Sequence, residues 1–219
     1  MNIPKKLWHI WVGPKPAPLK WMNTWVQNHP NWEYQIVDNE YVSKRKFHNQ
    51  HLIDQYMTMP KHHGYAGAAD LIRYEILFEH GGFMPGADSV CLENTDELWT
   101  ESTEFCYTVY ENEKIKPGFV SPIQAASPGN LFLKFIIDDL HKLKTTDLLN
   151  RPVYRVTGNQ YLRDVLKIVD FPIKIFPSHY LIPLHFSDKP ENRYKGPDKI
   201  YAEQLWGSTK NIYDQGINH

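Results

Sequence analysis

The sequence has few cysteines, no excess of charge of either sign and no long apolar run. Two cysteines among 219 residues are too few for a disulfide framework or a four-sulfur zinc site. The 24 Lys and Arg residues are matched by 25 Asp and Glu residues. The chain therefore lacks the basic excess with which proteins bind nucleic acids or membrane surfaces through bulk charge, and we expect no nucleic-acid partner.

Targeting signals are also missing. The basic start of the chain leads into an apolar segment of about six residues, which is too short for a signal-peptide core or a membrane span. No Asn-X-Ser/Thr sequon occurs. Together with the small number of cysteines, which is typical of a reducing compartment, these absences predict a cytoplasmic protein without a membrane span.

Aromatic residues, in contrast, are abundant. The chain contains 7 Trp, 13 Tyr and 10 Phe residues, 14% of the total. Such rings fill a core or stack on flat, partly polar ligands such as bases and sugars. A chain of this length can bury a substantial core, and the lack of repeats and linkers favours one domain. We therefore expect residues 1–219 to form a single domain and the protein to be a monomer.

The order of periodic segments predicts the fold class. An apolar strand over residues 7–12 is followed by a helical pattern over 18–28 and a second strand over 32–37, which is typical of a parallel sheet with crossover helices. Further helices are expected over 65–80, 130–143 and 161–167, and further extended segments over 83–90, 104–110 and 118–125. The last fifty residues have weak periodicity, so an irregular wrap is expected there. The sequence thus predicts an α/β fold with a mixed, mostly parallel sheet flanked by helices.

One stretch in the first half carries the chemistry. Asp70 and Arg73 lie three residues apart on a predicted helix and therefore share a face. The pair Gly81-Gly82 then ends that helix, and Asp88 follows a short strand, at the kind of sheet edge where α/β proteins bind ligands. Taken singly, an Asp/Arg pair on a helix is usually an exposed ion pair of little consequence, so the order of the pieces matters more than any one of them.

That order resembles the glycosyltransferases with a DXD-containing sugar-binding region, a group related to the catalytic domains of clostridial glucosylating toxins. Their pattern is a helix with Asp-x-x-Arg, a Gly-Gly stop and a strand leading into Asp-x-Asp. Asp88 matches the second aspartate of that motif, whereas Gly86 stands in place of the first. The opening Ile-Pro-Lys-Lys-Leu-Trp-His-Ile-Trp-Val-Gly of residues 3–13 is similar to the first strand of the same family.

The resemblance implies a GT-A (Rossmann-like) fold, with residues 1–95 as the nucleotide-sugar-binding half and residues 96–219 as the acceptor-side half and C-terminal wrap. It implies transfer of a sugar from a nucleotide diphosphate sugar, UDP-sugar favoured, to a glycan or other hydroxyl acceptor, with retention at the sugar carbon. Mn²⁺ or Mg²⁺ is the implied metal, since these ions accept one or two carboxylates together with substrate phosphates. The expected partners are thus a nucleotide-sugar donor and a glycan or small hydroxyl acceptor.

The same resemblance assigns roles to individual residues. Near the base, Trp11 would stack on the ring, with His9 and Ile10 shaping the pocket. At the sugar and diphosphate, Asp70 would bind donor hydroxyls, Arg73 would contact the sugar or diphosphate, Asp88 would bind the metal, Ala87 and Ser89 would lie beside the ribose or the metal, and Trp206 would cap the leaving group. Gln204 occupies a position where family members often have a histidine, so the metal would have few protein ligands.

Two alternatives stay open. Gly86 and Gln204 are compatible with a degenerate relative that binds a sugar nucleotide or a glycan without turnover. A metal-dependent phosphoesterase would need at least two converging metal-binding groups, and the sequence offers one firm candidate, Asp88.

Overall fold

The computed structural model describes residues 3–59, 62–149, 151–210 and 212–213. Within these residues the main sheet is mixed, with strand β6 running against the other members. In spatial order its strands are β2 (Glu33–Asp38), β1 (Lys6–Trp11), β3 (Gly82–Met84), β6 (Lys116–Ala126), β5 (Cys106–Asn112) and β7 (Ile173–Phe176). The predicted mixed, mostly parallel sheet is therefore confirmed.

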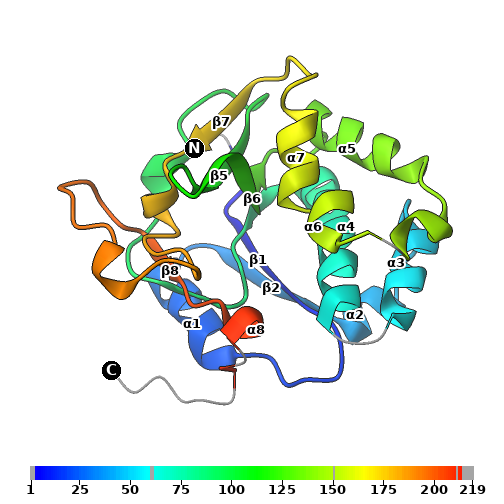
Figure 1. Cartoon of the computed structure of the whole chain (residues 1–219), viewed down its shortest axis with the longest axis horizontal. Coiled ribbons are helices and arrows are strands. Elements are labelled where there is room, and N and C mark those ends of the chain that lie inside the picture. The colour runs from blue at the N-terminus through cyan, green and yellow to red at the C-terminus, as the bar shows by residue number, and fades with distance from the viewer. Residues whose placement is uncertain (1–2, 60–61, 150, 211, 214–219) are drawn as a thin grey trace.

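Helices cover both faces of this sheet (Figure 1). They are α1 (Leu19–Asn28), α2 (Asn39–Ser43), α3 (Gln50–Thr58), α4 (His62–His80), α5 (Leu131–His141), α6 (Val153–Val156), α7 (Asn159–Val165) and α8 (Gly207–Lys210). Short 3₁₀ turns occupy Asp96–Leu98, Thr145–Leu148, Ser178–Tyr180 and Pro190–Asn192. No helix among the described residues is long and apolar enough to cross a lipid bilayer.

Alternation along β1 divides the core into two layers. Trp8 and Ile10 pack against the helices α3 to α7, whereas Leu7 packs on the opposite face with Trp25 of α1 and Phe83 of β3. Since successive side chains of a strand point to opposite faces, a continuous apolar run is what a strand covered on both sides requires. This explains why Lys6–Trp11 contains no exposed stripe.

The C-terminal fifty residues are more regular than the sequence predicts. Strand β7 pairs in parallel with β5, and a strand β8 (Ala202–Gln204) pairs antiparallel with β4 (Ser89–Cys91). The expectation of an irregular wrap is wrong at these two places, because strands of four and three residues are too short to display a period. The β4–β8 pairing places Gln204 opposite Ser89, immediately after Asp88.

The turn at Gly81-Gly82 joins α4 to β3 in very little space. Both residues have positive φ angles, 64° and 104°, which side-chain-bearing residues rarely adopt. A Cβ atom at Gly82 would lie 2.4 Å from the backbone oxygen of Lys6 on the neighbouring strand β1. The turn therefore depends on glycine both for its conformation and for the close approach of two backbones.

We predict that Gly82→Ala lowers the free energy of unfolding by about 3 kcal/mol or more, because backbone strain and a backbone clash add together. The matched control is Gly129→Ala. Gly129 also has a positive φ, 73°, but nothing lies within 4 Å of the added carbon, so only the conformational cost of about 1 kcal/mol is expected. Urea unfolding of the two variants measures both values, and equal losses would contradict the clash.

Candidate functional site

The end of β1 carries the three residues that are expected to contact the nucleotide base. His9 is fully buried, with Nδ1 3.1 Å from the hydroxyl of Tyr34. Burial lowers the pKa of His9 to about 3. Its neighbour Ile10 is packed in the core on the opposite face of the sheet, so the two side chains do not line one pocket.

Trp11, at the edge of the sheet, is partly exposed. Its indole nitrogen donates to the backbone oxygen of Lys15 at 2.7 Å. The indole ring and the Tyr213 ring make an edge-to-face contact, with their centroids 4.9 Å apart. Of the three residues at the end of β1, Trp11 is the one whose ring can meet a ligand.

Asp70 and Arg73 are a buried pair on α4, with 7% and 9% of their surface exposed. The carboxylate accepts from Arg73 at 3.2 Å through one oxygen and from the hydroxyl of Thr157 at 3.0 Å through the other. Burial raises the pKa of Asp70, while Arg73 and Thr157 act in the opposite direction. The pair is therefore not the exposed ion pair that this spacing on a helix usually gives. Removing one partner would leave an uncompensated buried charge.

The guanidinium of Arg73 has hydrogen-bonding capacity that the described residues do not use. Its Nε atom is buried and has no partner among them. A buried donor of this kind is rare in native proteins without a ligand or water to satisfy it. Arg73 therefore combines a fixed positive charge with an available donor.

Thr157 and Gly158 form the turn between α6 and α7 that closes on Asp70. The hydroxyl of Tyr74 donates to the backbone oxygen of Thr157 at 2.6 Å, which fixes the turn to α4. A Cβ atom at Gly158 would lie 3.3 Å from a carboxylate oxygen of Asp70. Thr157 is not among the site residues predicted from the sequence. Its signal was a Thr-Gly pair ahead of a short helix, and only the fold shows which carboxylate it faces.

Asp88 follows β3 in a turn that also contains Ala87. Its carboxylate accepts from the side-chain amide of Gln204 at 2.5 Å, and its backbone oxygen accepts from Leu205 at 2.8 Å. Ser89 is buried; its hydroxyl donates to the backbone of Gly86 at 2.6 Å and accepts from the indole of Trp25 at 3.0 Å. Ser89 thus holds the turn that presents Asp88.

Gly86 and Gln204 share one small volume. A Cβ atom at Gly86 would lie 2.9 Å from the amide oxygen of Gln204 and 3.3 Å from Asp88. That amide oxygen is buried and has no hydrogen-bond partner among the described residues. The side chain of Gln204 therefore fills the space beside Asp88 into which a longer residue at position 86 would extend.

The protein oxygen atoms near Asp88 are too few to coordinate a divalent ion unless a bound ligand supplies further oxygens. The described residues contain no group of three or more His, Cys, Asp and Glu residues that could hold a metal. Asp88 and the amide oxygen of Gln204 supply two hard oxygen atoms, and Mg²⁺ or Mn²⁺ can take its remaining ligands from substrate phosphates and water. The residues present are thus compatible with a metal held mainly by a diphosphate.

Trp206 lies two residues beyond Gln204 in an unusual conformation. Its φ of 61° makes it the one non-glycine residue with a positive φ in the described ranges. The indole nitrogen donates to the backbone oxygen of Leu184 at 3.1 Å, and the rings of His185 and Phe186 lie 5.2 Å and 5.0 Å away between centroids. Three side-chain contacts therefore fix its position.

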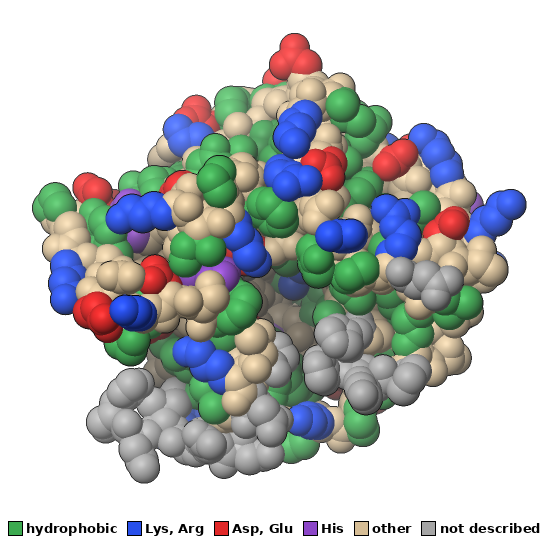
Figure 2. All heavy atoms as spheres, in the orientation of Figure 1, with side chains coloured by type: hydrophobic (Ala, Val, Ile, Leu, Met, Phe, Trp, Pro, Cys, Tyr) green, Lys and Arg blue, Asp and Glu red, His purple; other side chains and the backbone are tan. Residues whose placement is uncertain are grey.

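The residues predicted from the sequence lie at four places in the fold: at the end of β1, on α4, in the turn after β3 and, for Trp206, just after β8. Figure 2 shows that the surface is hollowed between the segment of β8 and α8 and the helices α4 and α6. Asp70 and Arg73 come from α4, and Gln204 ends β8. The carboxyl ends of parallel strands meet at one edge of a sheet, where ligands bind in this class of fold.

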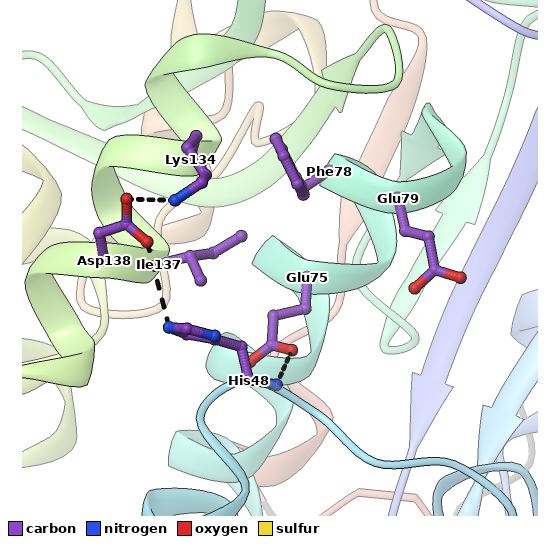
Figure 3. Close-up of a pocket in the computed structure, with 7 residues that line it drawn as sticks. All are labelled: His48, Glu75, Phe78, Glu79, Lys134, Ile137 and Asp138. Atoms are coloured by element: carbon purple, nitrogen blue, oxygen red, sulfur yellow. Dashed lines mark hydrogen bonds and ion pairs between the residues drawn. The ribbon is translucent and has the colours of Figure 1, made fainter.

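A separate pocket of about 200 Å³ lies between α4 and α5 (Figure 3). None of the residues predicted from the sequence lines it. The carboxylate of Glu75 accepts the backbone N–H groups of His48 and Asn49 at 2.6 and 2.8 Å, and so attaches the loop before α3 to α4. The charged side chain of Glu75 in this pocket therefore has a structural role.

Comparison with known proteins agrees with this geometry. Residues 18–106 match the family described as "Glycosyltransferase sugar-binding region containing DXD motif". The segment contains Asp70, Arg73 and Asp88, so the resemblance found in the sequence is confirmed over these residues.

Two curated proteins are similar to the chain. An uncharacterized glycosyltransferase of Acanthamoeba polyphaga mimivirus is 24% identical over 218 residues, covering 94% of this chain and 83% of the relative. The initiation-specific alpha-1,6-mannosyltransferase of Candida albicans is 29% identical over 133 residues, 56% of this chain and 32% of the relative. Both names, with the family match, support glycosyl transfer as the general activity.

Solved structures support the fold. The PaToxG glycosyltransferase superposes with a TM-score of 0.57 at 14% identity, covering 75% of this chain and 69% of that one. A glycosyltransferase involved in the glycosylation of the major capsid of PBCV-1 superposes with a TM-score of 0.53 at 9% identity, covering 95% and 97%. The chain therefore has a glycosyltransferase fold.

The burial of His9 predicts a pH dependence of stability. As the pH falls below 6.5, the unfolded chain binds a proton at this histidine that the folded chain, with a pKa of about 3, does not bind. Stability is therefore lost between pH 6.5 and about 3, by up to about 1.4 kcal/mol for each pH unit. In His9→Gln the loss between pH 7 and 4.5 should be smaller by about 2.5 kcal/mol.

Urea unfolding at the two pH values measures this difference. The exposed His51, changed to Gln in the same way, is the matched control. A His9→Gln protein with the pH dependence of the unchanged protein would show that the buried imidazole is not the source.

Proposed function

We propose that the protein transfers a sugar from a nucleotide diphosphate sugar, UDP-sugar favoured, to the hydroxyl group of a glycan or small acceptor, with the help of a divalent ion and with retention. The observation that carries this proposal is the buried pair Asp70–Arg73, with its unused guanidinium donor, inside a segment that matches a glycosyltransferase sugar-binding region. Titratable side chains that are buried beside a specific charged partner cluster at functional sites.

The roles follow from the charge that develops in the reaction. The bond between the sugar carbon and the diphosphate breaks, a bond to the acceptor oxygen forms, and the acceptor proton leaves with the phosphate. Arg73 would stabilise the negative charge gained by the diphosphate. Asp70, with both oxygens already oriented by Arg73 and Thr157, would bind donor-sugar hydroxyls. Trp11 would stack on the base.

The remaining residues would serve the diphosphate end. Asp88 and Gln204 would hold a divalent ion, Mn²⁺ or Mg²⁺, which supplies Lewis-acid stabilisation of the leaving group. The backbone of Ala87 and the turn fixed by Ser89 would border the ribose. Trp206 would cover the leaving group and exclude water from it.

Isothermal titration with UDP-sugars and GDP-sugars, with and without Mn²⁺, tests the proposal directly. Binding that requires or is strengthened by Mn²⁺, followed by transfer or slow donor hydrolysis, is the expected result. Absence of binding to every sugar nucleotide would refute it. Tight binding without any turnover would instead favour the second candidate, a degenerate sugar-nucleotide-binding protein, which the bond between Gln204 and Asp88 makes reasonable.

We predict that Asp88→Asn weakens donor binding in Mn²⁺ by about tenfold or more and leaves binding without metal unchanged, because an amide is a poorer ligand for a hard cation than a carboxylate. The matched control is Glu203→Gln, one residue before Gln204, whose carboxylate pairs with Arg193 at 3.0 Å. The same titrations measure both variants. A loss of equal size with and without Mn²⁺ would assign Asp88 a role independent of metal.

The shared volume of Gly86 and Gln204 generates a second prediction. Gly86→Asp should push the flexible end of Gln204 aside and place a second carboxylate beside Asp88, since the nearest atom is a side-chain amide 2.9 Å away. We expect the affinity of the nucleotide-free protein for Mn²⁺ to rise by about tenfold, as measured by electron paramagnetic resonance. Gly86→Ala brings the same crowding without the charge, and an equal rise in both variants would contradict the prediction.

A further inference from the structure

Strand β5 carries a buried carboxylate that is not among the predicted site residues. Glu111, near the end of β5, has 4% of its surface exposed. It accepts from the imidazole Nε2 of His185 at 2.8 Å, from the Lys116 ammonium at 2.5 Å and from the side-chain amide of Asn159. Each donor belongs to a different part of the chain: His185 lies in the segment between β7 and β8, Lys116 in β6 and Asn159 in the first turn of α7. Glu111 therefore ties three elements to β5.

The hydrogen bonds of His185 indicate which tautomer its ring adopts. Its side chain is fully buried. Nδ1 lies 2.7 Å from the hydroxyl of Ser187 and accepts the backbone N–H of Ser187 at 3.3 Å. Because a backbone N–H can only donate, Nδ1 is the acceptor and Nε2 carries the proton that is donated to Glu111. Both ring nitrogens are thus used inside the protein.

The turn that His185 fixes is the turn that holds Trp206. Leu184 accepts the indole N–H at 3.1 Å, and the rings of His185 and Phe186 contact the indole. Lys116, which also bonds to Glu111, lies 5.5 Å from the centre of the Phe186 ring. Trp206 has a positive φ, which is unfavourable for a bulky residue and persists only where the surroundings enforce it. These side-chain contacts, together with the backbone hydrogen bonds from Leu205 to Asp88 and from Lys210 to Trp206, form those surroundings.

The other end of the network reaches the Asp70 pair. Asn159 bonds to Glu111 and lies two residues after Thr157, whose hydroxyl donates to Asp70. One carboxylate therefore connects the turn that orients Asp70 with the turn that holds Trp206.

We propose that Glu111 is a positioning residue that, through His185, holds Trp206 in its left-handed conformation over the donor site. The inference rests on the proposed function for the role of Trp206, but the positioning itself is independent of that role. It assigns to the carboxylate no contact with substrate. Loss of Glu111 would let the turn of residues 184–187 move and Trp206 relax, while Asp88 and its turn stay in place.

The test follows the side chain itself by ¹⁹F NMR on protein labelled with 5-fluorotryptophan, the Trp206 signal being assigned by its loss in Trp206→Phe. In Glu111→Ala the Trp206 signal should shift or broaden, with the other indole signals unchanged. Glu111→Gln keeps an oxygen that can accept from His185, so it should restore most of the signal. His185→Phe, which keeps the ring volume, should resemble Glu111→Ala and provides a second variant if Glu111→Ala does not fold.

The matched control is Glu113→Ala. Glu113 also ties the β5 region to the C-terminal part, accepting from the backbone and hydroxyl of Ser178 at 2.8 and 2.5 Å, without a contact to the Trp206 turn among those described. It should leave the Trp206 signal unchanged. A Trp206 signal that is unaltered in folded Glu111→Ala and His185→Phe would overturn the proposal.

Titration with UDP and a UDP-sugar then separates this proposal from the proposed function. Glu111→Ala should weaken UDP binding by about tenfold to a hundredfold, because a displaced contact residue costs that much, with Glu111→Gln close to the unchanged protein. If the unchanged protein binds no sugar nucleotide, the proposed function fails while the ¹⁹F result still decides whether Glu111 positions Trp206. Equal UDP affinity in all variants with a shifted Trp206 signal would overturn the assignment of Trp206 to the donor site.

Discussion

The close approach of β3 to β1 determines how the charged residues are arranged around the sheet. It places the start of β3 so near the backbone of Lys6 that position 82 has no room for a side chain. The helix that carries Asp70 and Arg73 ends immediately before this point, and the turn that carries Asp88 begins immediately after the short strand. Both charged parts of the candidate site are therefore joined to the centre of the sheet through one two-glycine turn and the short strand that follows it.

Burial of charge is the second organising feature. Near-zero net charge excludes a broadly basic binding surface, yet the interior contains Asp70, Arg73 and Glu111, each nearly inaccessible. Buried charges are costly unless they are paired. Asp70 is paired with Arg73 on its own helix and with Thr157 87 residues away, and Glu111 is paired with His185 74 residues away. Their cost is offset by contacts that fix one element to another, so the same interactions that make the site polar also make it rigid.

The sequence predicted the sheet class, the main helices and the order of the charged residues, because those depend on local periodicity and spacing. It missed β7 and β8, which are too short for a period, and with them the pairing that brings Gln204 to Asp88. It also missed Thr157 and Glu111, since their partners lie 87 and 74 residues away in the chain. Most of the tryptophans, among them Trp25, Trp32 and Trp99, are buried, whereas Trp11 and Trp206 are partly exposed.

The departure at position 86 is best understood together with Gln204. Considered alone, a glycine in place of an acidic residue is a loss of one ligand oxygen. In the fold, the volume beside Asp88 is occupied by an amide group that reaches it from β8, a strand that the β4 pairing holds in register. An amide carries one acceptor oxygen and no charge, so the exchange keeps an oxygen near Asp88 while reducing the negative charge. A site of this composition should bind a divalent ion weakly by itself and more strongly when a diphosphate contributes its own oxygens, because the ligand then supplies the charge that the protein lacks.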